Sequence, residues 1–136
     1  MATIPSILSI AGSDPSSGAG VQADLKTISS IGGYGLTAIS ALTIQNTQRV
    51  ERFIPISKND LLDQIRVVSE DFSVKGVKIG MLPTLDSVEA VVEALQTYSF
   101  PNVVYDPIMV SSTGQTLMNI EVRREIIQRL SPLLDL

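Results

Sequence analysis

The chain has 136 residues, of which 44% are hydrophobic, so it can form one folded domain with a core but is too short for two of ordinary size. Its net charge of −4, with no basic cluster larger than Arg123 and Arg124 on an expected solvated helix face, argues against a nucleic acid or an anionic membrane as a partner. Because cysteine and histidine are absent, thiolate and histidine mechanisms are excluded, which leaves carboxylates, lysines, hydroxyls, backbone amides or a metal bound by oxygen.

The amino-terminal sequence MATIPSILSI contains Pro5 and no basic residue, so it does not resemble a secretory signal. No apolar run approaches the roughly 20 residues that cross a bilayer. We therefore expect a cytoplasmic protein.

The first predicted elements are a strand, a loop and a helix. The apolar run 4–10 predicts a strand, and the small residues of 12–20 predict a loop. Apolar residues at steps of four and three then indicate one buried face of a helix: Val21, Leu25, Ile28 and Ile31. Gly32 and Gly33 predict its end, where a positive φ is often needed.

The next segment predicts a strand, an irregular strand and a helix. Residues 36–44 are rich in β-branched and small side chains and predict the second strand. The run 50–56 contains Pro55, so we expect an edge strand or a flap there. Ser57 and Asp60 have the spacing of a capping box, with a helix after them. Its expected inward-facing residues are Leu61, Leu62, Ile65 and Val68.

Two further strand–helix pairs follow. Residues 74–79 predict the third core strand, and Thr84 is the expected N-cap of a helix. Residues 102–105 predict a short strand, and Asn119 the cap of a last helix. The expected buried residues of these two helices are Val88, Val91, Val92 and Leu95, and Val122, Ile126 and Leu130.

The carboxyl-terminal residues predict one more change of structure. Ser131 and Pro132 should end the last helix, and residues 133–136 indicate the beginning of another buried strand. Throughout the chain, apolar runs alternate with segments of helical period, which is typical of β-α-β units around a parallel sheet. We therefore predict an α/β fold.

The loop at residues 11–20, AGSDPSSGAG, joins the carboxyl end of a strand to the amino end of a helix. Ligands of open α/β sheets bind at this edge, where glycines permit close approach and helix amides can receive acceptor atoms. The spacing fits neither a Walker loop nor a dinucleotide fingerprint. A flexible connection without a ligand remains the alternative.

Four sequence blocks resemble the hydroxymethylpyrimidine kinases of the ribokinase-like superfamily. They are AGSDPSSGAGVQADLKT at 11–27, ALTIQNT at 41–47, VKIGML at 77–82 and VVYDP at 103–107. The resemblance implies a three-layer α-β-α fold with a mainly parallel central sheet. It also implies that residues 1–136 are the amino-terminal, substrate-binding part of one kinase domain, with 45–56 as a flap or edge strand.

The resemblance implies a binding site for a pyrimidine at the carboxyl edge of the sheet. Gln45 would hydrogen-bond the ring, because an amide offers donors and an acceptor to an aminopyrimidine edge. The alternative is an exposed turn amide. Gly12 and Ala19 would line the pocket, Met81 would form an apolar wall or belong to the core, and Ile108 is a pocket residue by similarity alone.

Two carboxylates are further candidates. Asp24 would accept a hydrogen bond from the amine or hydroxymethyl group of the substrate, or would only interact with the dipole of its helix. Asp106 follows a strand and precedes Pro107, so it would lie near a Mg²⁺–phosphate group or simply form a turn.

The activity implied by the resemblance is ATP-dependent phosphorylation of 4-amino-5-hydroxymethyl-2-methylpyrimidine and its monophosphate in thiamine biosynthesis, with ATP and Mg²⁺ as cofactors and a homodimer as the complete protein. Family members are considerably longer, and their catalytic side chain and nucleotide pocket lie in a second half with a GTGC-type segment. We therefore expect no catalytic residue in this sequence and no turnover by this chain alone. The alternatives are a pyridoxal-type kinase of the same fold and a non-catalytic, truncated pyrimidine-binding fragment.

Overall fold

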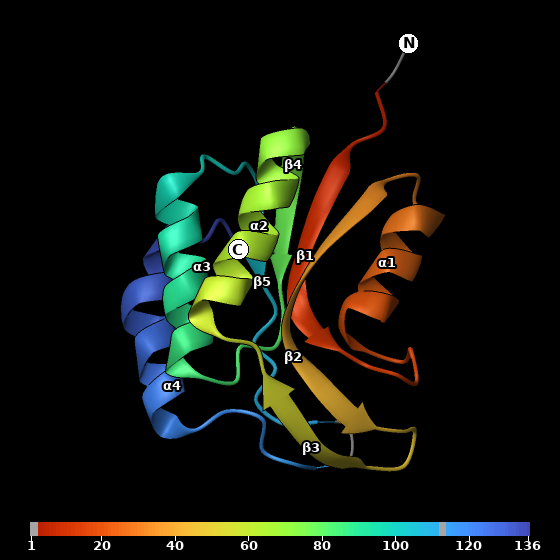
Figure 1. The fold of residues 1–136 in the computed structure, drawn as a ribbon, viewed down its shortest axis with the longest axis vertical. Helices are drawn as coiled ribbons and strands as arrows, with labels where there is room; N and C mark the ends of the chain where they lie inside the picture. Colours follow the sequence, from red (N-terminus) through yellow and green to blue (C-terminus); the bar gives the residue numbers. More distant parts are fainter. Residues whose placement is uncertain (1–2, 112–113) are drawn as a thin grey trace.

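The computed structural model describes residues 3–111 and 114–136. They form three layers, with one sheet between two layers of helices (Figure 1). The sheet has five strands in the order β3-β2-β1-β4-β5. Its parallel strands are β1 (Ser6–Ser13), β2 (Tyr34–Gln45), β4 (Val74–Ile79) and β5 (Val103–Tyr105), and β3 (Val50–Pro55) lies antiparallel to β2 at the edge. One face carries α1 (Gly20–Ser30), and the other carries α2 (Lys58–Asp71), α3 (Leu85–Thr97) and α4 (Ile120–Glu125). The predicted α/β class is confirmed.

The helices begin where side chains satisfy the first free amides. Ser57 Oγ accepts a hydrogen bond from the amide of Asp60 at 3.1 Å. Thr84 and Ser87 form a reciprocal capping box with two side-chain-to-amide bonds of 3.1 Å. Asn119 caps α4 through its Oδ1 in the same way, at 2.9 Å. The three predicted N-caps are therefore confirmed.

The main core lies between the sheet and the layer formed by α2, α3 and α4. Leu61 and Ile65 of α2 are completely buried there, and Leu62 and Val68 pack against them in part. The predicted inward faces of α3 and α4 are buried as well, with Leu95 only partly covered. Arg123 and Arg124 are exposed on α4, as expected.

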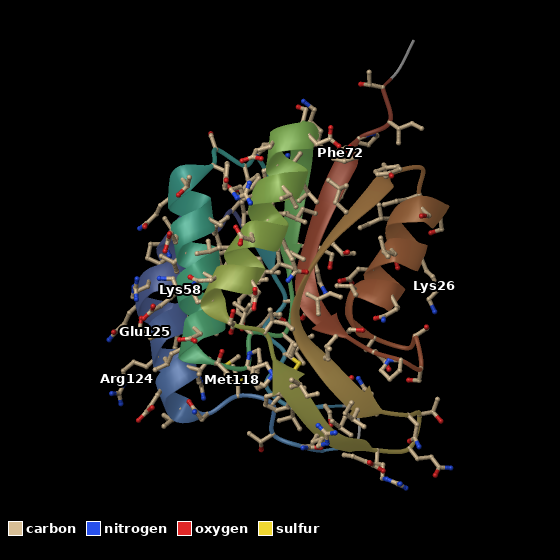
Figure 2. All side chains as sticks on the ribbon, viewed as in Figure 1. Lys26, Lys58, Phe72, Met118, Arg124 and Glu125 are labelled. Carbon is tan, nitrogen blue, oxygen red and sulfur yellow. The ribbon has the colours of Figure 1, made fainter. Side chains whose placement is uncertain are left out.

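The surface between α2 and α3 is crossed by ion pairs. Lys58, at the start of α2 (Figure 2), lies 3.5 Å from Glu89 and 3.0 Å from Glu93. These groups are partly exposed, so their contribution to stability is small compared with that of the core below them.

Two predictions for the first β-α unit were wrong. Ile31 is 79% exposed, because the amide of Gly33 bonds back to the Ile28 carbonyl at 2.8 Å and ends α1 at Ser30. The first strand continues to Ser13 instead of ending near residue 11, because its last residues still pair with β2. The loop therefore begins at residue 14.

The predicted strand at 133–136 was also wrong. After α4 the chain continues as a π-helical turn (Ile126–Leu130) and a 3-10 turn (Ser131–Leu133), since a proline at the start of a helical turn is compatible with it. The backbone becomes extended only at Leu134, and the amide of Asp135 then bonds to the Val103 carbonyl at 2.8 Å. The last residues thus run beside β5 without forming a strand.

None of the helices in the described part of the chain combines the length and the apolar character needed to cross a membrane.

Replacement of Leu61 by alanine tests the core. Because Leu61 is fully buried, we expect the free energy of unfolding to fall by about 2–5 kcal/mol. Val67 lies on the same helix but is 50% exposed, so Val67→Ala should cost less than about 1 kcal/mol. Urea denaturation of both variants provides the measurement, and equal losses would contradict this account of α2.

Candidate functional site

A cavity of about 210 Å³ opens at the carboxyl edge of the parallel sheet. This edge gathers the loop after β1, the β2–β3 hairpin and the segment after β5 (Figure 1). The volume is below the roughly 300–1,000 Å³ of pockets for drug-sized ligands, so the cavity suits a small molecule. Its lining residues are Ala11–Asp14, Gly18–Gly20, Thr43, Gln45, Val50, Lys78, Met81, Ile108, Val110, Ser111 and Leu117.

The loop over the cavity is organised by the carboxylate of Asp14, which is 3% exposed. Its Oδ1 accepts hydrogen bonds from the amide and the hydroxyl of Ser16 at 2.8 and 2.7 Å. Its Oδ2 accepts from the amides of Gly18 and Ala19 at 3.0 and 2.9 Å. These three loop amides therefore bond to a side chain of the loop itself and are not available to a ligand.

A second set of contacts ties the loop to α1. Gln22 Oε1 accepts a hydrogen bond from the amide of Asp14, and Gln22 Nε2 donates to Ser13 Oγ, both at 2.8 Å. Gly20 has a φ of +61°, and a β-carbon there would collide with the carbonyl oxygen of Gly12. Only glycine allows α1 to begin this close to the end of β1.

The loop bonds also set the protonation of Asp14. Burial alone would raise the pKa of its carboxyl, but the hydrogen bonds from the Ser16 side chain and the loop amides outweigh burial and hold the pKa below its ordinary value of 3.8. The carboxylate is thus charged at neutral pH, and its charge is directed into the loop.

Gln45 ends β2 at the cavity wall and is half-buried rather than an exposed turn amide. Its Nε2 donates to Thr43 Oγ1 at 2.7 Å, and Thr43 Oγ1 donates to the Ser13 carbonyl, also at 2.7 Å. Within the described residues nothing bonds to Gln45 Oε1. The side chain is therefore held in place with an acceptor and one amide hydrogen left for a ligand.

An apolar wall faces these polar groups. Met81 and Leu117 form a small buried cluster with Ala41, and Ile108 packs against it. A β-carbon at Gly12 would lie 3.1 Å from Met81 Sδ, so the missing side chain leaves a flat surface beside the sulfur. The predicted lining residues Gly12, Ala19, Gln45, Met81 and Ile108 are thus brought together.

Asp24 does not line the cavity. It lies in the second turn of α1, beyond the first turn, where the helix dipole acts most strongly. Its carboxylate pairs with Lys78, with Nζ 3.0 and 3.1 Å from the two oxygens, and accepts a hydrogen bond from Ser9 Oγ at 2.6 Å.

Asp106 also lies outside the cavity lining and is exposed. Its amide donates to the Ile79 carbonyl at 2.8 Å, and its carbonyl accepts from the amide of Ile108 at 2.9 Å, which places it in a turn after β5. Among the described residues, no group of three or more acidic side chains could hold a metal ion. The turn is therefore observed, whereas the place of Asp106 near a Mg²⁺–phosphate group stays a prediction.

Asp14, Thr43 and Lys78 are among the cavity residues that were not predicted as site residues from the sequence. Asp14 precedes proline and serines, a pattern typical of side-chain-bonded turns. Lys78 is a charged residue inside an apolar strand, which itself suggests a special environment. Thr43 carries no such signal, because threonine is common in strands.

The sheet and its cavity define an α/β protein with a cavity of small-molecule size at the carboxyl ends of parallel strands. Residues 14–136 match the family described as phosphomethylpyrimidine kinase. The hydroxymethylpyrimidine/phosphomethylpyrimidine kinase of Escherichia coli K12 is 43% identical over 129 residues, which are 95% of this chain and 48% of that protein. The chain therefore belongs to the phosphomethylpyrimidine kinase family.

Solved structures agree with this assignment. The phosphomethylpyrimidine kinase of Clostridium difficile 630 has a TM-score of 0.88 and 41% identity, with 97% of this chain and 57% of that chain covered. A pyridoxal kinase of Bacillus subtilis, solved as an ADP complex, has a TM-score of 0.84 and 32% identity, with 97% and 50% covered. The fold is thus that of the ribokinase-like kinases, and the chain spans about half the length of the relatives it matches.

Replacement of Asp14 by asparagine tests the loop. The asparagine side chain keeps one acceptor oxygen, but its NH₂ group cannot accept the two hydrogen bonds that the second carboxylate oxygen accepts. We therefore expect the free energy of unfolding at pH 7 to fall by about 1–3 kcal/mol. Because the folded pKa is lowered, the contribution of Asp14 is present above pH 3.8 and is lost as the pH falls below that value, through the folded pKa.

The measurement is urea denaturation between pH 2.5 and 7. The Asp14→Asn variant should lose the part of the acid dependence that arises below pH 3.8. Asp71→Asn, at an exposed position of α2, serves as the matched control and should change stability by less than about 0.5 kcal/mol. An Asp14→Asn variant as stable as the control would contradict the role of this carboxylate.

Proposed function

We propose that this chain provides the acceptor-binding cavity of a kinase that phosphorylates 4-amino-5-hydroxymethyl-2-methylpyrimidine and its monophosphate. The family assignment supports a kinase, and the relatives' names supply the pyrimidine. The cavity is small, has an apolar wall and lies at the sheet edge where such folds bind ligands. Residues 1–136 are then the substrate-binding part of one domain, with β3 as a flap at its edge.

The observation that carries the proposal is the orientation of Gln45. Thr43 takes one of its amide hydrogens, which leaves Oε1 and the other hydrogen beside the cavity. The amino group and neighbouring ring nitrogen of a 4-aminopyrimidine form a donor–acceptor pair of complementary spacing. Met81 and the bare surface at Gly12 then contact the faces of the ring.

The complete enzyme, in this proposal, uses ATP as the phosphoryl donor and Mg²⁺ as its counterion, and is a homodimer. The ADP complex of the related pyridoxal kinase supports an adenine nucleotide. Phosphoryl transfer depends on positioning and on charge stabilisation, and this chain contributes the positioning of the acceptor. In this proposal Asp106 supplies a single carboxylate near the phosphates, because the described residues hold no cluster of three or more acidic side chains around it.

Pyridoxal is the second candidate acceptor. The support for it is the likeness to pyridoxal kinase, whose substrate is also a flat ring with a hydroxymethyl group. Pyridoxal has a ring hydroxyl and an aldehyde in place of an amino group beside a ring nitrogen, so it matches the Gln45 amide less closely. We therefore favour the pyrimidine.

Calorimetry with the 136-residue chain tests the proposal. Binding of the pyrimidine alcohol should release heat, whereas pyridoxal should bind more weakly. Gln45→Leu should weaken binding of the alcohol by about 5- to 100-fold, which corresponds to the roughly 1–3 kcal/mol lost when polar ligand groups stay unpaired. Gln48→Leu, a few residues away on the exposed turn, is the matched control and should bind normally.

Three results would decide between the candidates. Equal affinity of the Gln45→Leu variant and the unaltered chain would remove Gln45 from the site. Tighter binding of pyridoxal would favour the second candidate. Absence of heat with both alcohols would reject an acceptor-binding function for this chain.

A further inference from the structure

Lys78 is the only cationic side chain among the described residues that line the cavity. It comes from β4, and its ammonium lies 3.0 and 3.1 Å from the two carboxylate oxygens of Asp24 on α1. Ser9 of β1, which is completely buried, donates to the same carboxylate at 2.6 Å. Three elements thus fix one ion pair, whose side chains are 27% and 19% exposed.

The position of the ammonium is further limited by its surroundings. Ser9 and Lys78 are direct neighbours in the β1–β4 pairing, so both side chains lie on the α1 face of the sheet. A β-carbon at Gly80 would lie 3.1 Å from Lys78 Nζ and 3.0 Å from the β-carbon of Ala11. The glycine therefore leaves the space that the ammonium needs.

The ion pair leaves a hydrogen-bond donor at the cavity. A lysine ammonium has three N–H groups, and the two oxygens of Asp24 take at most two of them. The charges of Lys78 and Asp24 balance each other, and the Asp14 carboxylate is satisfied by its own loop. The donor is thus strong but carries no excess positive charge, which suits an uncharged oxygen better than a phosphate.

We propose that Lys78 donates a hydrogen bond to the hydroxyl oxygen of the alcohol bound in the cavity, and that Asp24 is a positioning residue that acts on the ligand only through Lys78. This inference rests on the proposed function, in which Gln45 takes the amino edge of the ring and leaves the hydroxyl without a partner. The same hydrogen bond also stabilises the negative charge that develops on this oxygen during phosphoryl transfer.

Two ligands that differ only in the hydroxyl test the proposal. Calorimetry on the 136-residue chain compares 4-amino-5-hydroxymethyl-2-methylpyrimidine with 4-amino-2,5-dimethylpyrimidine. The unaltered chain should prefer the alcohol by about tenfold or more, as expected for a hydrogen bond from a charged donor. Lys78→Met should reduce this preference to about one and leave the affinity for the dimethyl compound unchanged.

Further variants separate a direct contact from a structural effect. Lys75→Met makes the same chemical change at an exposed position of β4 and should keep the full preference. Lys78→Arg retains the charge and should keep part of the preference. Asp24→Asn loosens the ammonium and should also lose part of it, whereas a carboxylate that only stabilised the fold would weaken both ligands equally.

The outcomes distinguish this inference from the function on which it rests. If the unaltered chain binds both ligands equally, or Lys78→Met keeps the preference, Lys78 does not contact the hydroxyl although the cavity still binds the ring. If neither ligand binds, the proposed function fails and this inference fails with it. Should Lys78→Met not fold, the preference of the unaltered chain and of Lys78→Arg still decides, because the inference requires both.

Discussion

The cavity depends on a buried carboxylate that satisfies four donors of its own loop. Asp14 holds the loop through the amides of Gly18 and Ala19 and through both donors of Ser16, so the small residues at the end of β1 are bonded into one arrangement. A buried charge is tolerated only when it is fully hydrogen-bonded, and this requirement selects one conformation of the loop. The part of the cavity wall that this loop forms is therefore ordered by hydrogen bonds within the loop itself.

The order of the strands places the polar side chains on both sides of this loop. Because β1 lies between β2 and β4, Gln45 and Lys78 approach the cavity from strands on opposite sides of the loop. The segment after β5 supplies Ile108 and closes the apolar side. A ring ligand would thus meet an amide, an ammonium and an apolar wall from three separate parts of the chain.

Much of the fold could be predicted from sequence, because strands and caps depend on local patterns. The strand at residues 74–79 and the caps at Thr84 and Asn119 lie where the sequence indicated. The end of the chain was predicted less well. Apolar character alone did not distinguish a helical turn at Leu133 from a strand, since both bury the same side chain.

The sequence by itself determined the α/β class, the family and the place of the 11–20 loop at the carboxyl edge of the sheet, because these follow from periodicity and from short contiguous motifs. Only the tertiary structure decided that Asp24 is turned to Lys78, 54 positions along the chain, and that Lys78 reaches the cavity instead. The polar group that would face a ligand depends on strand order, on register and on the space left by Gly80. The residues next to it in the sequence do not determine any of these.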